Sequence, residues 1–203
     1  MNISEQERKR ISTAIRTAEE KTSGEIVCVL AQTSSDTTAL PILVAAVIAL
    51  SLPWLLVAFT AMSVHRILLL QIAVFFALSL LLCLPRVRVA LLPGAARRAV
   101  AHRVAMEQFS IRGIAHKKER SGILIFISLA EHYARIIADE GIAARVPQSE
   151  WQEAIDALIA HMSGGRIVDG FITAIEKCGH VLAIHFPRSE TSHDELPDRI
   201  YLI

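Results

Sequence analysis

Charge is almost absent from one long part of this 203-residue sequence. Residues 39–84 contain a single charged side chain, that of Arg66, although the whole chain has 21 basic and 20 acidic residues. The other 157 residues therefore have about 25 per cent charged residues, a normal density for a globular domain. These two compositions exclude a purely soluble protein, a disordered chain and a fibrous repeat.

Cysteines are also scarce, and the familiar catalytic and cofactor motifs are missing. The three cysteines, Cys28, Cys83 and Cys178, exclude a disulfide scaffold, and as reduced, structural thiols they suit a cytoplasmic domain. The sequence has no His-x-x-x-His or His-Glu-x-x-His pattern, no Gly-x-Ser-x-Gly, and no Walker or Rossmann glycine pattern. It therefore predicts no cofactor-binding residue and identifies no catalytic residue.

The weakly charged stretch predicts a transmembrane helical hairpin over residues 39–84. Residues 40–64 and 67–84 are uncharged, and each run reads as a spanning helix. The shorter run is about 27 Å long as a helix, against a hydrocarbon core of about 30 Å. The tip is expected at His65 and Arg66. Two alternatives are a helical hairpin buried in a water-soluble core and a re-entrant loop kinked at Pro53.

The distribution of basic residues predicts which side of the membrane the chain ends occupy. Lys21 is alone in the 19 residues before Leu40, and Arg66 is alone between the two spans. Five arginines follow within 19 residues of Leu84: Arg86, Arg88, Arg97, Arg98 and Arg103. Because basic residues accumulate on the cytoplasmic side of membrane spans, both termini are expected in the cytoplasm.

The segment after the hairpin, residues 85–120, is strongly basic. It has nine basic and two acidic residues, a net charge of +7. Such a segment at the end of a span indicates contact with anionic lipid in the bilayer. Nucleic acid is not expected as a partner, because no interleaved aromatic residues or reading motif accompany the charge.

Strands and helices are predicted on both sides of the hairpin. Residues 26–30 and 122–127 are apolar runs typical of strands buried on both faces, and residues 133–138 predict a third strand in a hairpin with the second. Ser4 and Glu7 predict a capping box before a first helix, and residues 149–152 predict another. A helix is expected over residues 95–112, with Val100, Val104 and Phe109 on its face.

These elements predict one α/β domain, a three-layer α/β/α sandwich around a small mixed sheet, with the transmembrane hairpin inserted after the first strand. Residues 1–38 supply the first helix and strand, residues 85–187 the remainder, and residues 188–203 a flexible acidic tail. Periodicity leaves open whether residues 181–186 are a strand or the end of the last helix. Two spans return the chain to its starting side, as the charge distribution also requires.

Three segments of the sequence resemble the TPM domain family. They are residues 22–27 (TSGEIV), residues 120–128 (RSGILIFIS) and residues 135–142 (RIIADEGI), and the likeness continues through Trp151 to the sequence His-Phe-Pro at 185–187. The family occurs in thylakoid lumen proteins linked to photosystem II repair and in many bacterial membrane proteins. The resemblance implies an α/β/α fold and, for this chain, a bacterial inner membrane protein.

The resemblance also implies a candidate site. Some members are described as acid phosphatases or bind divalent cations through acidic loops at strand ends. The corresponding loop here contains Asp139 and Glu140, the candidate metal ligands for Mg²⁺, Mn²⁺ or Ca²⁺. The Gly-Leu-Glu common beyond that loop is Gly141-Ile142-Ala143 here, so one acid is absent. The alternative interpretation is that Asp139 initiates a loop and Glu140 points into solvent.

Two functions are compatible with these features. The favoured one is a membrane-anchored cytoplasmic TPM-like domain that binds a membrane protein partner or helps to assemble a membrane complex. The alternative is a weak, divalent-cation-assisted phosphatase that acts near the membrane surface. The low number of acids at the strand ends favours the binding role.

Overall fold

The computed structural model describes residues 3–34, 39–84, 87, 93–114, 121–188 and 196–203. The chain forms two compact units. One comprises Met1–Ser34 and Val100–Ile203, and the other comprises Ser35–Ala99. The first unit is thus built from both sides of the weakly charged stretch.

Two apolar helices make up most of the second unit. They are α2 (Ala39–Phe59) and α3 (Val64–Leu82), with a mean hydropathy of 2.6 and 2.1. Only 11% and 6% of the most apolar 18-residue stretch of each helix is buried, which disagrees with a helical hairpin buried in a water-soluble core. Helix α2 also runs without interruption through Pro53, so a kinked re-entrant loop is not observed. Both helices are long and apolar enough to cross a membrane.

The tip of this hairpin lies earlier than predicted. Residues 60–63 separate the helices, whereas His65 and Arg66 belong to the first turn of α3. Ser63 has the extended conformation of an N-cap residue, and Arg66 N donates to its carbonyl (3.0 Å). The expected tip at His65 and Arg66 is therefore wrong. The N-cap Ser63 precedes these two polar residues, so they lie inside the first turn of the helix.

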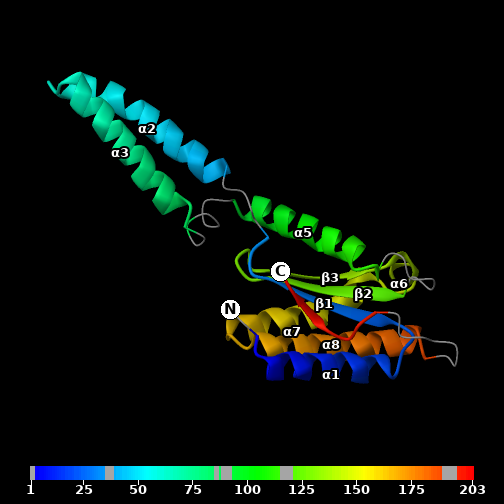
Figure 1. Cartoon of the computed structure of the whole chain (residues 1–203). Coiled ribbons are helices and arrows are strands. Elements are labelled where there is room, and N and C mark those ends of the chain that lie inside the picture. Colours follow the sequence, from blue (N-terminus) through cyan, green and yellow to red (C-terminus); the bar gives the residue numbers. More distant parts are fainter. Residues whose placement is uncertain (1–2, 35–38, 85–86, 88–92, 115–120, 189–195) are drawn as a thin grey trace. The chain divides into compact units, whose positions relative to one another are not determined.

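A four-stranded mixed sheet forms the centre of the first unit (Figure 1), with the strand order β3-β2-β1-β4. Strand β1 pairs in parallel with β2 and β4, whereas β2 and β3 are antiparallel. The bounds are Glu25–Ala31 for β1, Gly122–Ser128 for β2, Tyr133–Ala138 for β3 and Ile200–Leu202 for β4. The strand encoded before the apolar helices thus lies between two strands encoded after them.

Both central strands, β1 and β2, are buried along their whole length. In β1, Cys28 and Leu30 enter one core cluster, whereas Val27 and Val29 enter the cluster on the opposite face. This alternation follows from the two-residue period of a strand, and the unbroken apolar run follows from burial on both faces. The two predicted buried strands are confirmed, and so is the predicted β-hairpin of β2 and β3.

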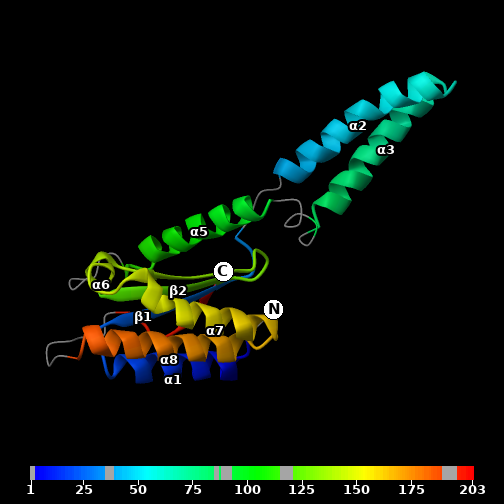
Figure 2. The ribbon, with the colours of Figure 1, turned by 180° about the vertical axis from the view of Figure 1, so that it is seen from behind.

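Helices cover the two faces of the sheet unequally, as Figures 1 and 2 show. Among the described residues, one face packs mainly on three long helices and the other on α5. The three are α1 (Glu5–Glu19), α7 (Gln152–Ser163) and α8 (Ile167–His185), and α5 spans Gly94–Ile111. This arrangement is the predicted three-layer α/β/α sandwich.

Helix α5 contacts the sheet through a stripe that matches the predicted one in part. Ala101, Ala105 and Phe109 are buried, whereas Val100 and Val104 are only half-buried. The prediction is confirmed for Phe109, and Val104 packs half-buried against the same core cluster, whereas the more fully buried positions are the alanines that follow each valine. Alanines one turn apart let the helix backbone approach the sheet closely, and a valine in their place would hold it further away.

The last helix resolves the alternative left open at residues 181–186. Helix α8 is continuous from Ile167 to His185, so this segment is a helix end and not a strand. Gly179 lies inside α8 because α1 crosses there: a Cβ at this position would lie 2.7 Å from the Cβ of Ala18. A glycine that looks like a helix stop in the sequence is thus a point of close helix packing.

The two predicted capping boxes have different outcomes. Glu7 N donates to Ser4 Oγ (3.3 Å) and Ser4 N donates to Glu7 Oε2 (2.8 Å), so the first is confirmed. The second, at residues 149–152, is wrong. Pro147 instead initiates a 3-10 helix, η2 (Gln148–Trp151), and α7 begins only at Gln152. The fixed φ of proline starts the turn two residues before Ser149 can cap it.

The prediction of a flexible tail over residues 188–203 is wrong at the C-terminal end. Strand β4 pairs with β1, and Gln32 N donates to the carbonyl oxygen of Ile203 (2.9 Å). Ile200 is buried in the core. A three-residue strand in a polar segment has no periodic signal of its own, because it is stabilised by pairing with a strand some 170 residues away. Residues 189–195 lie outside the described part of the chain.

Candidate functional site

Asp139, the first candidate ligand, begins the short helix α6 (Glu140–Ala143) directly after β3. Its Oδ1 accepts from Glu140 N (2.7 Å), and its backbone N donates to the carbonyl oxygen of Gly122 at the start of β2 (3.0 Å). The Asp139 carbonyl accepts from Ala143 N (2.8 Å). Asp139 is therefore an N-cap residue that fixes the turn out of the sheet, the role expected of a loop-initiating aspartate.

Asp139 and Glu140 lie in different surroundings. Its second oxygen, Oδ2, is buried and has no hydrogen-bond partner among the described residues, whereas Glu140 is exposed. Within the described ranges, no group of three or more His, Cys, Asp and Glu side chains is placed to hold a metal ion. Asp139 and Glu140 thus supply two acids at this strand end, and their role as ligands for Mg²⁺, Mn²⁺ or Ca²⁺ stays a prediction.

A second polar cluster lies at the opposite end of β2, where the parallel strands β1 and β2 both end. The buried carboxylate of Glu131, in the turn between β2 and β3, accepts from Thr33 Oγ1 (3.1 Å) and from Ser34 N (3.0 Å). It also accepts from the hydroxyl of Ser128, which in turn accepts from Ser34 Oγ (2.9 Å). Glu131 thus ties the segment after β1 to the β2–β3 turn.

Sequence reasoning missed Glu131, although it predicted the β-hairpin whose connection contains this residue. An acidic residue in a short turn is ordinarily exposed, so burial of Glu131 is not expected from its position alone. The only available signal was Ser128 at the end of an otherwise apolar strand. In α/β sheets, polar groups at the carboxyl ends of parallel strands are the usual place for a site.

A buried acid also lies at the start of β1. Glu19, in the last turn of α1, accepts from Ile26 N through Oε1 (2.7 Å) and is only 5% exposed. Burial raises the pKa of Glu19 to about 9, and the hydrogen-bonded carboxylate of Asp198 and the charge of Glu25 add to this increase. Glu19 is therefore protonated at neutral pH.

The sequence did contain a signal for Glu19. It follows Ile11 and Ile15 at four-residue spacing, so it belongs to the buried stripe of α1. Its partner Asp198 lies in the segment that was taken for a flexible tail. The pairing could not be foreseen, because the two carboxyls are brought together only when β4 joins the sheet.

The cysteines are reduced. Cys28 and Cys178 are buried, Cys83 is half-buried, and all three are free thiols. Burial raises the pKa of the Cys28 and Cys178 thiols, so both stay protonated. A protonated, inaccessible thiol is a poor nucleophile, and these two side chains act as part of the core.

The family comparison decides what kind of domain this sheet belongs to. The sequence model of the TPM domain matches residues 85–181, which include β2, β3, α7 and most of α8. The chain carries a TPM domain. No curated protein matches the sequence.

A solved structure has a similar fold. The BA42 protein from the psychrophilic bacterium Bizionia argentinensis, determined by NMR, is 22% identical in sequence. The superposition covers 100% of this chain and 97% of that chain, with a TM-score of 0.64. At this level of identity the likeness shows the fold.

The compact unit that contains the matched residues extends beyond them in the chain. Helix α1 and strand β1 precede residue 85, and β4 follows residue 181, yet all three pack in the same unit. Strand β1 is central in the sheet, so the matched segment alone would leave the edge of β2 uncovered. The sheet of this unit therefore includes a central strand from the part of the chain that precedes the apolar helices.

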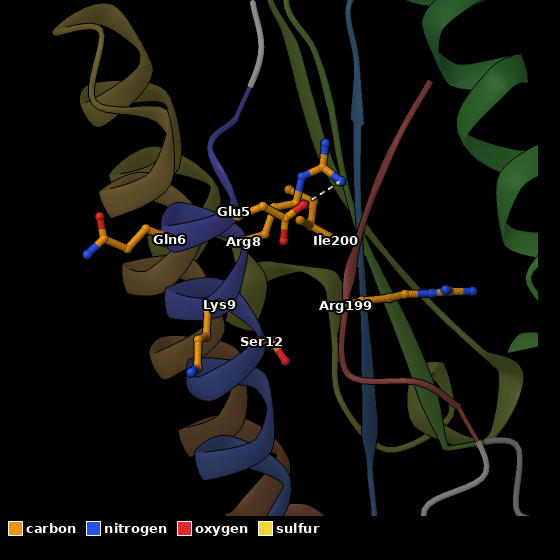
Figure 3. Close-up of a pocket in the computed structure, with 7 residues that line it drawn as sticks. All are labelled: Glu5, Gln6, Arg8, Lys9, Ser12, Arg199 and Ile200. Atoms are coloured by element: carbon orange, nitrogen blue, oxygen red, sulfur yellow. Dashed lines mark ion pairs between the residues drawn. The ribbon is translucent and has the colours of Figure 1, made fainter.

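A cavity of about 600 Å³ lies between α1 and β4, and its polar side chains do not converge. In Figure 3, Gln6 and Lys9 point away from the strands, and Arg199 extends away from α1. Arg8 makes an exposed ion pair with Glu5 at 4.0 Å. Because these charged groups point in different directions, the cavity is not organised to hold one ligand.

Proposed function

We propose that this chain is a membrane-anchored TPM domain that binds a protein partner in a membrane-associated complex at the cytoplasmic face of a bacterial inner membrane. The observation that carries the proposal is the position of α2 and α3 in the chain. They interrupt the TPM domain after its central strand β1, so the domain is tethered on both sides of the hairpin.

The exposed side chains of α2 and α3 support a location in the bilayer. Leu43, Trp54 and Phe59 on α2 and Phe76 and Leu80 on α3 are all more than 60% exposed within the chain. Apolar surface of this extent is covered by lipid or by other spanning helices. The distribution of basic residues around the spans favours a cytoplasmic domain.

The basic segment adds a contact with lipid to the proposal. Arg97, Arg98 and Arg103 lie on α5 and Arg112 follows it, whereas the other basic residues of the segment fall outside the described part. Juxtamembrane basic residues each gain about 1 kcal/mol near an anionic surface. We therefore expect the segment to contact anionic lipid.

The phosphatase alternative requires Asp139 as a metal ligand, whereas this side chain caps α6 and its neighbour Glu140 is exposed. A binding role does not require Asp139 to be a metal ligand. The two functions differ in what the purified protein does on its own.

Cross-linking in native membranes, followed by purification of the full chain in mild detergent, tests the binding role. We expect one membrane protein to be recovered in constant ratio to the chain. The same preparation should release no more phosphate from an aryl phosphate with Mg²⁺ than its Asp139→Asn variant. A chain recovered alone, with metal-dependent phosphate release lost in Asp139→Asn, would contradict the binding role and favour the phosphatase.

A further inference from the structure

The two faces of the sheet are covered by helices of different charge. Among the described helices, α5 packs on one face, and α1, α7 and α8 pack on the other (Figures 1 and 2). Helix α5 contains three arginines and one acid, Glu107. The helices of the opposite face together contain more acidic than basic residues. An anionic surface is therefore attracted to the side of the domain that α5 covers.

An arginine of the sheet lies on the same side as α5. Tyr133 and Ile137 of β3 pack against the core cluster under α5, and Arg135 lies midway between them in the strand. Because side chains alternate along a strand, Arg135 shares the face of these two residues. It is exposed and makes no ion pair with a described residue. Its positive charge is thus available to a group outside the domain.

Two further arginines lie beside β4. The guanidinium carbon of Arg112 is 3.8 Å from the ring centre of Tyr201, and that of Arg199 is 4.7 Å from the same ring centre. Tyr201 packs against the core cluster under α5, so this pair lies on the same side of the sheet. Two like charges so close together repel each other. Neither makes an ion pair within the described part of the chain, so an anion outside the domain would relieve the repulsion.

The exposed side of α5 also carries apolar side chains. Met106 and Ile111 are 44% and 62% exposed, and Arg103 on the same helix is exposed as well. Exposed apolar side chains beside arginines are typical of a helix that lies at a lipid interface. Nucleic acid binds mainly through its phosphates, so it would not account for the two apolar side chains.

The connection between α3 and α5 keeps this side of the domain within reach of a bilayer. Helix α3 ends at Leu82 and α5 begins at Gly94, so eleven residues connect them. An extended chain of this length spans at most about 40 Å. With α3 in a membrane, as proposed, the lipid surface is always available to α5, whereas a soluble acidic partner must arrive by diffusion.

We infer that the side of the domain covered by α5 lies on the headgroups of an anionic bilayer. This side, here named the α5 face, comprises Arg103, Met106, Ile111, Arg112, Arg135 and Arg199. Its guanidinium groups contact lipid phosphates, and its two apolar side chains enter the headgroup boundary. The inference rests on the proposed membrane location. It extends the proposed lipid contact to Arg135 and Arg199, which lie outside the basic segment, and it specifies which side of the domain faces the membrane.

Fluorescence quenching in lipid nanodiscs tests the inference on the full chain. The chain carries Cys83→Ala and one exposed cysteine for a fluorophore, either Ser110→Cys on α5 or Thr17→Cys on α1. The two remaining native cysteines are buried and stay unlabelled. The nanodiscs contain phosphatidylcholine alone or an equal mixture of phosphatidylcholine and phosphatidylglycerol. A nitroxide on a fraction of the headgroups quenches a fluorophore that lies close to the lipid surface.

We expect quenching at position 110 to be at least threefold stronger than at position 17 in the mixed nanodiscs. Quenching at position 110 should decrease without phosphatidylglycerol, and also at about 1 M salt, where the Debye length falls to about 3 Å. Equal quenching at the two positions would overturn the inference. Quenching at position 110 that does not depend on phosphatidylglycerol would overturn it too.

Two arginines outside the basic segment make the test specific for the α5 face. Arg135→Glu combined with Arg199→Glu should reduce quenching at position 110 to the level seen in phosphatidylcholine alone. Lys9→Glu combined with Arg16→Glu makes the same charge change at exposed positions of α1 and should leave quenching unchanged. If the first pair does not unfold cooperatively in urea, the milder pair Arg135→Gln and Arg199→Gln decides. Wild-type quenching in a folded Arg135 and Arg199 variant would contradict the inference.

The same measurements separate this inference from the proposed function. A chain that does not enter nanodiscs would contradict the membrane location, and this inference with it. If the chain recovers a membrane protein but shows no preferential quenching at position 110, the binding role stands and the α5 face is not a lipid surface. If quenching is preferential but the chain is recovered alone, the α5 face stands and the binding role falls.

Discussion

Replacing Glu19 by Gln is expected to flatten the pH dependence of the free energy of unfolding between pH 5 and pH 9. In the folded protein, burial raises the pKa of Glu19 to about 9 from an ordinary value of 4.5. A glutamine at this position can accept from Ile26 N and donate to Asp198, so the hydrogen bonds of the protonated acid are preserved.

The sign of the effect follows from proton binding. Below pH 4.5, Glu19 is protonated in both the folded and the unfolded chain. Between pH 4.5 and 9 the unfolded chain loses this proton and the folded chain keeps it, so stability falls as the pH rises and levels off above pH 9. One proton changes the free energy of unfolding by about 1.4 kcal/mol per pH unit, which amounts to several kcal/mol over this range.

Urea unfolding of the full chain in detergent, followed through Trp151, measures this difference. Trp151 is 1% exposed, and replacing Trp54 by Phe leaves it as the sole tryptophan. The exposed neighbour Glu20 provides the control, since Glu20→Gln makes the same chemical change and should keep the wild-type slope. A Glu19→Gln chain with the wild-type slope would show that Glu19 ionises in the folded protein.

Glu131→Ala is expected to lower the free energy of unfolding by about 3 kcal/mol. The substitution removes the acceptor of Ser128 Oγ, Ser34 N and Thr33 Oγ1 together. Each buried donor left without a partner costs about 1–3 kcal/mol, and water can satisfy part of this loss at the two half-buried residues. Glu131→Gln should cost less, because one oxygen remains as an acceptor.

The same unfolding measurement checks Glu131, with Glu107→Ala on the exposed side of α5 as the matched control. We expect Glu107→Ala to change stability by less than about 0.5 kcal/mol, as is usual for an exposed position. A loss of under 1 kcal/mol in Glu131→Ala would mean that the cluster does not hold the segment after β1 to the β2–β3 turn.

Elements with a strong local pattern could be predicted from the sequence. The buried strands β1 and β2 are continuous apolar runs, and the Ser4–Glu7 capping box is complete within four residues. Strand β4 has no comparable pattern, because its three residues are stabilised by β1 and not by their neighbours in the chain. The start of α7 was also mispredicted. Ser149 alone predicts a helix that begins beside it, whereas Pro147 initiates the 3-10 helix η2 and α7 begins only at Gln152.

The candidate site could be predicted only in part. The position of Asp139 after a strand was predicted, and so was the alternative that it initiates a loop. The contacts of Glu131 and Glu19 depend on residues about 100 and 180 positions away in the chain, so periodicity cannot reveal them.

Removal of the two apolar helices tests the central claim most directly, which is that one TPM domain is assembled across an inserted membrane hairpin. In the variant, residues 39–84 are replaced by a short Gly-Ser linker. We expect a soluble protein that unfolds cooperatively, with Trp151 buried and the pH dependence due to Glu19 retained. An unfolded variant, together with cooperative folding of residues 85–203 alone, would contradict the claim.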